Sequence, residues 1–314
     1  MSALVVGEAL VDVVRRRDGR VAEHPGGSPL NVAVGLARLG REAHLLTWFG
    51  SDERGAAVRA HLEGSGVRIV PGSDGAPRTS TAVASLDEEG VATYGFDIDW
   101  RLPATSGAAE PLVVHTGSIA AVLEPGAAQV AELVAAQRER ATVTYDPNLR
   151  PALMGEPERA ARRVEPMLDL ADVVKVSDED LDWYAPGEDV ETVARRWAAR
   201  GPAIVVVTRG GEGALAVTAA GLRVTVAAPP VAVVDTVGAG DSFMGGLVDG
   251  LWSAGLLGAE RREALRAVDA ATLREVLERC ARIAAITVSR AGANPPTAAE
   301  LAADARGARP AGRG

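Results

Sequence analysis

The stretch that decides how this chain is interpreted is Asp235-Thr236-Val237-Gly238-Ala239-Gly240-Asp241. It follows an apolar, strand-like run at Val231–Val234 and leads into a helical pattern that begins at Ser242. A turn of small residues at the start of a helix leaves backbone N–H groups free at the positive end of the helix dipole. Because Gly238, Ala239 and Gly240 let an oxyanion approach the main chain closely, we expect an anion-binding site here.

Asp241 places a carboxylate beside this expected anion site. There it can accept the proton of a hydroxyl group that attacks a bound phosphoryl group. An anion site with an adjacent proton acceptor is the minimum that phosphoryl transfer to an alcohol requires. The alternative interpretation is an ordinary turn in which Asp241 only stabilises the start of the helix.

A second motif, Gly26-Gly27-Ser28-Pro29-Leu30-Asn31, precedes another helical pattern. Two glycines predict a turn, Ser28 is a good N-cap, Pro29 suits the first helical position, and Gly40 indicates the end of the helix. Asn31 then lies in the first turn, where its amide can donate to and accept from a hydroxylated ligand.

Composition limits the classes of function. The chain has 314 residues, 47% of them apolar, which suits one large α/β domain or two ordinary ones. A net charge of −9 argues against nucleic-acid and anionic-membrane partners. The single cysteine, Cys280, is expected to be a buried apolar residue and suits a reducing compartment. We find no signal-peptide pattern and no long apolar segment, so we expect a cytoplasmic protein.

Strand-like runs alternate with helical patterns along most of the chain, which predicts a mostly parallel sheet with helices on both faces. The runs expected to be strands are 3–6, 43–48, 112–115, 142–145, 173–176 and 204–208. The stretches expected to be helices are 52–63, 125–140, 157–170, 178–184 and 190–200. Val11–Glu23 and Thr79–Phe96 alternate without an intervening helix and predict two hairpins of a smaller sheet.

The two glycine-containing motifs together resemble the signatures of the PfkB (ribokinase-like) family of carbohydrate kinases. Gly26-Gly27-x-Pro29-x-Asn31-x-Ala33 matches the first signature and Asp235-Thr236-x-Gly238-Ala239-Gly240-Asp241 the second. The resemblance covers about residues 3–302. It implies a ribokinase-like αβα sandwich of one domain, 1–304, with lid segments at 11–24 and 78–102 and a disordered tail at 305–314. In this family the lid covers the sugar site and often forms a homodimer interface.

The resemblance also implies roles on the sugar side of the site. The aspartate that matches Asp12 accepts hydrogen bonds from sugar hydroxyls, and Gly26, Gly27 and Asn31 complete that side. Asp146-Pro147-Asn148-Leu149-Arg150 resembles a fructokinase pattern in which Arg150 lies near the transferred phosphate or the sugar; turn chemistry is the alternative. The opening Gly7–Asp12 resembles fructokinases and 2-keto-3-deoxygluconate kinases.

Further positions match the nucleotide and cation sites of the family. The residues expected to contact the nucleotide are Ser177, Thr208, Gly210, Gly213 and Gly240. Asp180 stands where an acid of the family organises Mg²⁺ through water, and Asp178 or Glu179 could take this role instead. The alternative without a metal is that these acids simply stabilise the start of a helix. The residues expected around a monovalent cation such as K⁺ are Asp235, Val237, Thr287, Arg290 and Gly292, although Pro296 replaces a serine that often contributes.

The expected function is therefore an ATP- and Mg²⁺-dependent sugar kinase, most similar to a fructokinase. Asp241 would take the proton of the acceptor hydroxyl, while the backbone N–H groups of Gly238–Asp241 neutralise the phosphoryl group. The alternatives within the fold are 2-keto-3-deoxygluconate, ribose or a nucleoside as acceptor. A sensor that binds sugar and nucleotide without catalysis is the alternative of another class.

Overall fold

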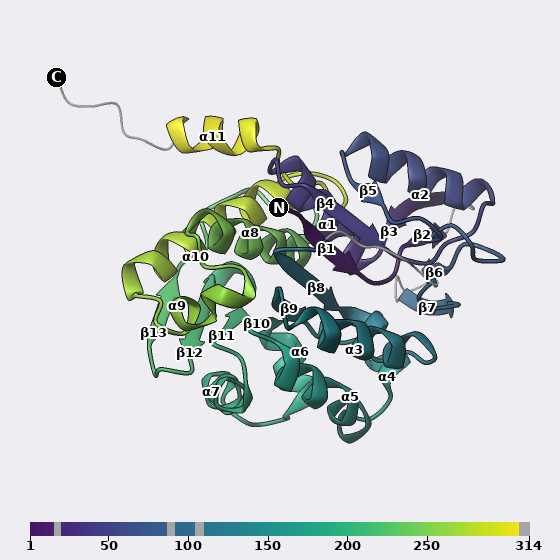
Figure 1. Cartoon of the computed structure of the whole chain (residues 1–314). Coiled ribbons are helices and arrows are strands. Elements are labelled where there is room, and N and C mark those ends of the chain that lie inside the picture. Colours follow the sequence, from purple (N-terminus) through teal and green to yellow (C-terminus); the bar gives the residue numbers. More distant parts are fainter. Residues whose placement is uncertain (16–19, 87–91, 104–109, 308–314) are drawn as a thin grey trace.

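The computed structural model describes residues 1–15, 20–86, 92–103 and 110–307. Its body is a nine-stranded sheet between two layers of helices (Figure 1). In spatial order the strands are β13 (Arg223–Val226), β12 (Ala214–Thr218), β11 (Ile204–Thr208), β10 (Val173–Ser177), β9 (Thr142–Asp146), β8 (Val113–Gly117), β1 (Ala3–Val6), β4 (Ala43–Leu46) and β5 (Arg68–Ile69). This is the α/β architecture that the alternating pattern predicts.

The strands from β5 to β11 run parallel, whereas β12 and β13 pair antiparallel. The inner strands are rich in valine, and β8 and β9 are buried along their whole length. Parallel strands covered on both faces need such apolar sequences, because both sets of side chains enter a core. All their carboxyl ends therefore meet at one edge, where ligands of such sheets bind.

Helices cover both faces of this sheet. The first face carries α1 (Ser28–Arg38), α2 (Glu53–Gly64), α8 (Ala239–Ser253), α9 (Arg262–Arg266) and α10 (Ala270–Val288). The second carries α3 (Gly126–Gln137), α4 (Pro151–Met154), α5 (Pro157–Leu170), α6 (Asp178–Tyr184) and α7 (Val190–Arg200). Short 3-10 turns lie at η1 (Ser118–Ala121), η2 (Gly210–Glu212) and η3 (Ala259–Arg261), and α11 (Ala298–Gly307) follows α10.

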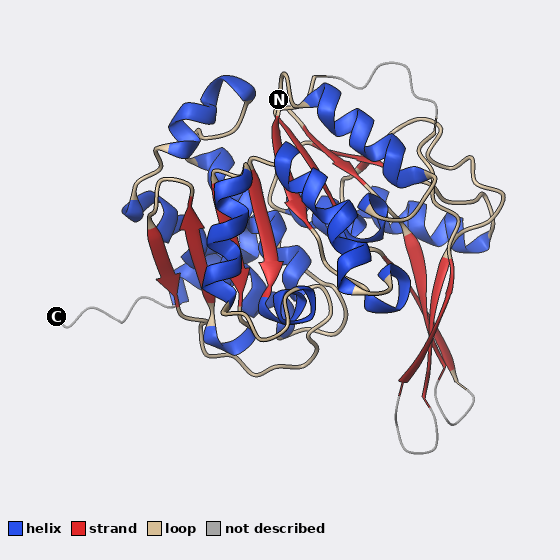
Figure 2. Cartoon of the chain, turned by 90° about the horizontal axis from the view of Figure 1, so that it is seen from below, coloured by secondary structure: helices blue, strands red, loops and turns tan. Residues whose placement is uncertain are grey.

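A smaller sheet of four strands forms the lid. Its order is β3 (Val21–Gly26), β2 (Leu10–Arg15), β6 (Thr81–Leu86) and β7 (Ala92–Asp97). Figure 2 shows these strands projecting from the body as a narrow, twisted sheet. The two predicted hairpins are present, joined by parallel pairing of β2 with β6. Their turns, at 16–19 and 87–91, lie outside the described residues.

The lid is tied to the body through Asp52, the N-cap of α2. Its Oδ1 accepts hydrogen bonds from Gly55 N at 2.8 Å and from Thr79 Oγ1 at 2.6 Å, and its Oδ2 accepts one from Thr79 N at 2.8 Å. Thr79 directly precedes the lid strands, so one carboxylate fixes both the start of a helix and the entry to the lid.

Two expectations at the edges of elements differ from the structure. Val231–Val234 is an exposed loop and not a strand. Pro229 and Pro230 lack the N–H groups that a strand ladder needs, and Val234 N donates instead to Val288 O at 2.8 Å. At the other end, α11 extends to Gly307, and residues 308–314 of the expected tail lie outside the described part.

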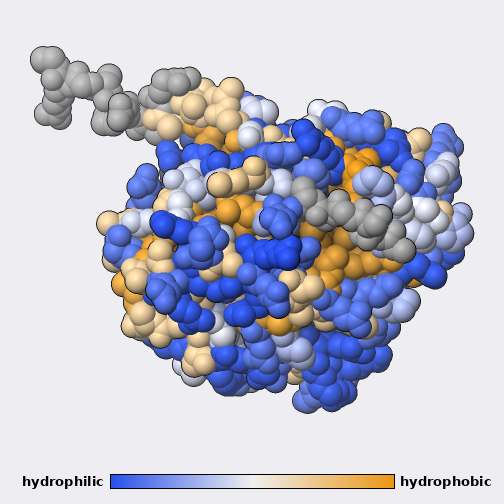
Figure 3. Space-filling view, in the orientation of Figure 1, coloured by the Kyte–Doolittle hydropathy of each residue, from blue (hydrophilic) through white to orange (hydrophobic). Residues whose placement is uncertain are grey.

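The surface seen in Figure 3 is mixed in hydropathy. On the face seen in Figure 3, hydrophilic residues cover most of the surface, and hydrophobic ones gather near its middle. Within the described ranges, no helix is long and apolar enough to cross a membrane.

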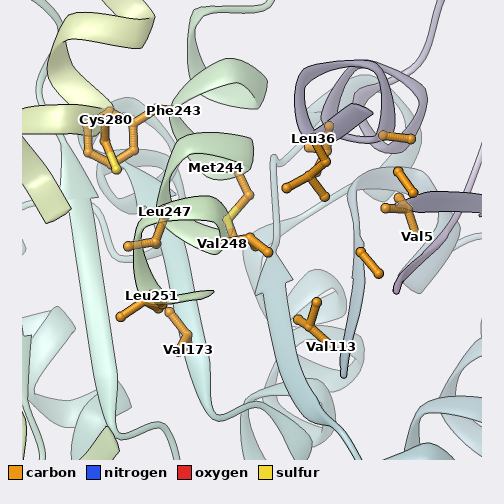
Figure 4. Close-up of a cluster of buried hydrophobic side chains, with 14 of the residues drawn as sticks. Val5, Leu36, Val113, Val173, Phe243, Met244, Leu247, Val248, Leu251 and Cys280 are labelled. Atoms are coloured by element: carbon orange, nitrogen blue, oxygen red, sulfur yellow. The ribbon is translucent and has the colours of Figure 1, made fainter. Parts of the chain in front are cut away.

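Helix α8 is the central element of the first face. Met244, Leu247, Val248 and Leu251 pack against strands and neighbouring helices (Figure 4). Its glycines bring α10 close: a Cβ added at Gly250 would lie 2.9 Å from Val276 Cγ1. Because α8 begins with the Gly238–Asp241 turn, its packing fixes the position of that turn at the sheet edge.

A buried carboxylate on α8 connects this helix to α10 and to the loop after α1. Asp249 is 1% exposed, and its Oδ1 accepts a hydrogen bond from Arg41, just beyond α1, at 2.7 Å. Its Oδ2 accepts one from Arg279 of α10 at 2.8 Å. Both arginines are partly exposed, so the carboxylate is paired while the cations keep contact with water.

We predict that Asp249→Ala lowers the free energy of unfolding by about 2–4 kcal/mol, because both arginines lose their buried partner. Since these cations can turn to water, the lower half of that range is expected. Denaturant unfolding measures the change, with Asp74→Ala as a control that removes an exposed partner of Arg59 and changes stability by less than about 1 kcal/mol. Equal losses for the two variants would contradict the role of Asp249.

Candidate active site

The sequence motifs meet at the carboxyl edge of the large sheet. Strand β1 leads to Glu8, β8 leads to Ser118, and β9 ends at Asp146. Ser177 and Thr208 are register partners at the ends of β10 and β11. The starts of α1 and α8 complete the edge and join the two signature motifs, as the contacts of Asp241 demonstrate.

Asp241 lies in the first turn of α8 and is 8% exposed. Its Oδ1 accepts a hydrogen bond from Ser28 Oγ at 2.6 Å, and its Oδ2 accepts one from Asn31 Nδ2 at 2.8 Å. The two motifs, about two hundred residues apart, are thus joined by their own functional groups. Two donors fix the orientation of a carboxylate that would otherwise rotate.

The expectation that Ser28 caps α1 was wrong. The helix begins at Ser28, and the N-cap is Gly27 with φ 112°. At this left-handed φ, glycine is the residue that fits without strain. The Ser28 hydroxyl is therefore free to donate to Asp241. Leaving a buried carboxylate without donors costs more free energy than leaving a helix start without a side-chain cap.

The anion-binding turn has the expected form with one difference. Gly238 is the N-cap of α8, at φ 75°, and a Cβ added there would lie 2.5 Å from Ala293 Cβ. Ala239 N donates to Thr236 O at 3.2 Å, so this N–H group already has an acceptor. Gly240 and Asp241 follow in the first turn, where N–H groups have no acceptor within the helix.

Lys175 is a site residue that the sequence analysis missed. It is the only lysine of the chain. Its Nζ is so close to Gly240 that a Cβ added at this glycine would lie 2.9 Å from it. Lys175 Nζ is also 2.8 Å from Asp146 Oδ2, and both side chains are buried. A single charged residue inside the valine-rich β10 was the available signal.

The electrostatics keep this buried pair charged. Burial opposes the charge of Lys175, but Asp146, Asp241 and Asp180 outweigh it and hold the lysine pKa above its usual value. Burial raises the pKa of Asp146 to about 6, and Lys175 limits that rise. At neutral pH a cation therefore lies beneath the anion-binding turn.

On the lid side, Asp12 lies within β2 and is partly buried. A side chain at Gly26 would overlap Asp12 Oδ2, which explains a glycine at this position. Burial raises the pKa of Asp12, and the positive charge of Arg150 lowers it. Arg150 itself donates to Asn148 Oδ1 at 2.7 Å, within its own loop. Asp12 thus adjoins Gly26, and Arg150 and Asp241 are close enough to act on it electrostatically.

Glu8 is a second site residue that was not predicted. Its side chain is 4% exposed and hydrogen-bonds Ser118, which has φ 55°. Burial raises the pKa of Glu8 to about 7, against the lowering influences of its own backbone, Ser118 and Arg150. Asp241 is close enough to raise it further.

The residues predicted for the nucleotide lie at and just beyond the ends of β10 and β11, which β8 and β9 separate from β1 in the sheet. Ser177 caps α6 by accepting a hydrogen bond from Asp180 N at 3.0 Å, as expected if this segment is the start of a helix. Asp180 Oδ1 accepts from Leu149 N at 3.1 Å. Thr208 is half-exposed, and Gly210 and Gly213 adopt φ 46° and 96° in the turn after β11. A side chain at Gly213 would overlap the carbonyl oxygen of Val226.

The residues predicted for a monovalent cation lie in the loop before α8, at the end of α10 and in the loop that follows α10. Asp235 accepts from Val237 N at 3.0 Å and from Gly292 N at 2.8 Å, which joins two loops. Thr287 donates to Ile283 O inside α10, and the Arg290 side chain pairs with Glu300. In the described part of the chain, no three His, Cys, Asp or Glu residues are grouped as a metal site.

We predict that Glu8→Gln changes how stability depends on pH. The folded state holds the proton of Glu8 up to about pH 7, whereas the unfolded chain releases it near the ordinary value of 4.5. The wild type therefore loses stability as the pH rises between these values. Relative to it, the variant should gain on the order of 2–3 kcal/mol between pH 4 and pH 8.

Denaturant unfolding at several pH values measures this difference. Glu63→Gln, which neutralises an exposed carboxylate of α2, is the matched control and should leave the pH profile unchanged. A constant difference between wild type and Glu8→Gln at every pH would show that the Glu8 carboxyl group is not buried as described.

Comparisons with known proteins identify the family of this chain. A family model described as "pfkB family carbohydrate kinase" matches residues 2–300. A fructokinase of Klebsiella pneumoniae is 36% identical over 264 residues, which cover 80% of this chain and 85% of the relative. The structure of a Xylella fastidiosa fructokinase with bound ATP matches with a TM-score of 0.80 at 25% identity, covering 98% of both chains.

A second solved structure has both substrate sides of a kinase site occupied. It is a double mutant of the Vibrio cholerae O395 fructokinase with fructose, ADP and a potassium ion. It matches with a TM-score of 0.77 at 28% identity and covers 96% of this chain and 98% of its own. With the family model spanning nearly the whole sequence and both signatures meeting at Asp241, this chain belongs to the pfkB family of carbohydrate kinases.

Proposed function

We propose that this carbohydrate kinase is a fructokinase that transfers the γ-phosphoryl group of ATP to a hydroxyl group of fructose. The observation that carries the proposal is the Asp241 carboxylate, oriented by Ser28 and Asn31 at the N-terminal turn of α8. The fructose and ATP assignments are supported by relatives named as fructokinases and by solved fructokinase structures with these ligands.

In the proposed arrangement, the sugar binds between the lid and the start of α1. Asp12 offers carboxylate oxygens, and Asn31 an amide, to its hydroxyl groups. Gly26 and Gly27 leave room for the ring. ATP lies along the ends of β10 and β11, near Ser177, Thr208, Gly210 and Gly213. Its terminal phosphate then faces the Gly238–Asp241 turn.

Asp241 accepts the proton of the attacking hydroxyl group as the oxygen bonds to the γ-phosphorus, and the bond from this phosphorus to the β–γ bridging oxygen breaks to release ADP. Ser28 and Asn31 keep the carboxylate in place, so it needs no reorientation during the reaction. The first-turn N–H groups and Lys175 stabilise the charge on the transferred group. The ion pair with Asp146 holds the Lys175 ammonium group in place. Such a fixed charge stabilises the transition state most strongly where water is excluded.

Cations fit this site as partners of the nucleotide. Mg²⁺ bound to the ATP phosphates would neutralise their charge, with Asp180 held nearby through water-mediated contact. Carboxylate oxygens and phosphates are the ligands that Mg²⁺ prefers, and it usually keeps several waters. We propose K⁺ for the loops joined by Asp235 and Gly292, on the model of the Vibrio cholerae relative.

The lid completes the proposal. It projects from the body and is anchored at Asp52 and Thr79, so it can close over the sugar and exclude water. The strand β3 forms an edge of the lid sheet and is largely exposed, which suits pairing with a second copy in a homodimer. Residues 1–304 would form one kinase domain. The buried, free thiol of Cys280 suits a cytoplasmic enzyme.

An assay that couples ADP release to a dye tests the proposed function directly. The wild-type protein is incubated with ATP, Mg²⁺ and one acceptor from a panel of fructose, 2-keto-3-deoxygluconate, ribose and adenosine. We expect the highest kcat/KM for fructose. A higher value for another acceptor would replace fructose in the proposal, and no turnover with any of them would indicate a binding protein.

We predict that Asp241→Asn reduces kcat by about 10²–10⁴-fold, because the variant cannot accept the hydroxyl proton. The loose transition state of phosphoryl transfer places the loss in the lower part of that range. Asparagine has nearly the same shape, so calorimetric sugar binding and the melting temperature should change little. A loss of kcat below about tenfold with intact binding would exclude Asp241 as the base.

We predict that Lys175 supplies charge stabilisation. The double variant Lys175→Met with Asp146→Asn removes the cation without leaving a buried, unpaired carboxylate. Its kcat should fall by about 10²–10³-fold, comparable to the removal of one stabilising donor, while the fructose KM changes little. The single variant Lys175→Arg, which keeps a cation beside Asp146, is the control. Equal losses of kcat for the control and the double variant would show that the positive charge at this position has no role.

A further inference from the structure

Glu8 is a buried carboxyl group that the mechanism above does not use. It lies just beyond β1, at the carboxyl edge of the sheet, and its side chain is 4% exposed. Ser118, just beyond the neighbouring strand β8, hydrogen-bonds it. The group thus lies at the carboxyl ends of two neighbouring parallel strands.

One oxygen of this carboxyl group has no partner. Glu8 Oε2 is buried and finds no hydrogen bond among the described residues. A buried polar atom without a partner costs free energy, so native proteins rarely keep one unless a ligand or water fills the position. Among the described residues, the only other buried carboxyl oxygens without a hydrogen-bond partner are those of Asp146, which forms an ion pair with Lys175.

The position of Glu8 points to the sugar. A Cβ added at Gly27 would lie 2.6 Å from the Glu8 carbonyl oxygen, so the Glu8 backbone packs directly against the glycine turn. Arg150 and Asp241 both act electrostatically on the Glu8 carboxyl group. Asp241 is the proposed base for the reacting hydroxyl group, and Arg150 is expected near the sugar or the transferred phosphate. No described aspartate or glutamate other than Asp12 and Asp241 has been assigned to that side.

We propose that Glu8 Oε2 accepts a hydrogen bond from a non-reacting hydroxyl group of the acceptor sugar, and that Glu8 thereby determines substrate specificity. This inference rests on the proposed function. A site built to bond a hydroxyl group rejects an analogue that lacks it, because the buried carboxyl oxygen is then left unpaired. Glu8 would therefore distinguish sugars that Asp12 and Asn31 bind equally.

The test measures kcat/KM of the wild type, Glu8→Gln and the exposed control Glu63→Gln with fructose and with a series of mono-deoxyfructoses. Each deoxy sugar lacks one non-reacting hydroxyl group. We expect Glu8→Gln to raise the fructose KM at least tenfold and the ATP KM less than twofold. One deoxy sugar should be bound equally by wild type and variant, because the contact is already missing.

Calorimetric titration of the sugar without ATP provides a second readout, independent of turnover. The fructose affinity of Glu8→Gln should fall by the same factor as its kcat/KM. Unchanged fructose affinity would overturn the proposal and assign Oε2 to a buried water. Equal losses for fructose and every deoxy sugar would also overturn it, because they indicate a general disturbance of the site.

A shorter acid keeps the test decisive if Glu8→Gln does not fold. Glu8→Asp retains the buried carboxyl group but withdraws its oxygens from the sugar, and the same pattern across the deoxy sugars is expected. Failure of the proposed function is distinguishable from failure of this inference. In the first case the wild type itself does not phosphorylate fructose; in the second it does, and Glu8 variants match it.

Discussion

The structure depends on one constraint: a carboxylate buried at the start of α8 must receive hydrogen bonds. Asp241 meets this requirement with donors from the other signature motif, Ser28 and Asn31. This pairing fixes α1 against α8 and, with them, the lid strands that lead into α1. The same contacts that satisfy a buried charge also orient it for proton transfer, so stability and chemistry share the same atoms.

The rest of the first face holds this junction in place. Asp249 links α8 to α10 and to Arg41 in the loop after α1, and small residues of α8 allow close packing of the helices. Beneath the turn, the Lys175–Asp146 pair places a cation where phosphoryl charge would develop. The buried charges of this molecule lie mainly at such junctions, where paired hydrogen bonds offset the cost of leaving water.

Much of the fold follows from local patterns. Helices α5, α6 and α7 have the predicted limits, because periodicity and end signals agree in each. Six of the nine strands of the body and both lid hairpins are also as predicted, to within two residues at most ends, whereas β5, β12 and β13 were not predicted. The prediction of a strand at Val231–Val234 was wrong, because the apolar pattern alone does not show that the two preceding prolines prevent strand pairing. Roles that depend on distant partners were missed: Ser28 donates to Asp241, Lys175 lies under Gly240, and Glu8 has an open oxygen. No local pattern encodes which residues the parallel sheet brings together.

The most direct test of the central claim is a double-mutant cycle between Ser28→Ala and Asp241→Asn, measured as the rate of single-turnover phosphoryl transfer. If Ser28 acts by orienting the Asp241 carboxylate, Ser28→Ala slows the wild type by about tenfold, in line with the loss of one hydrogen bond to a charged group. In the Asp241→Asn background it should then slow transfer by less than about twofold, because no base remains to orient. The same slowing in both backgrounds would contradict the account, because it would show that Ser28 and Asp241 act independently.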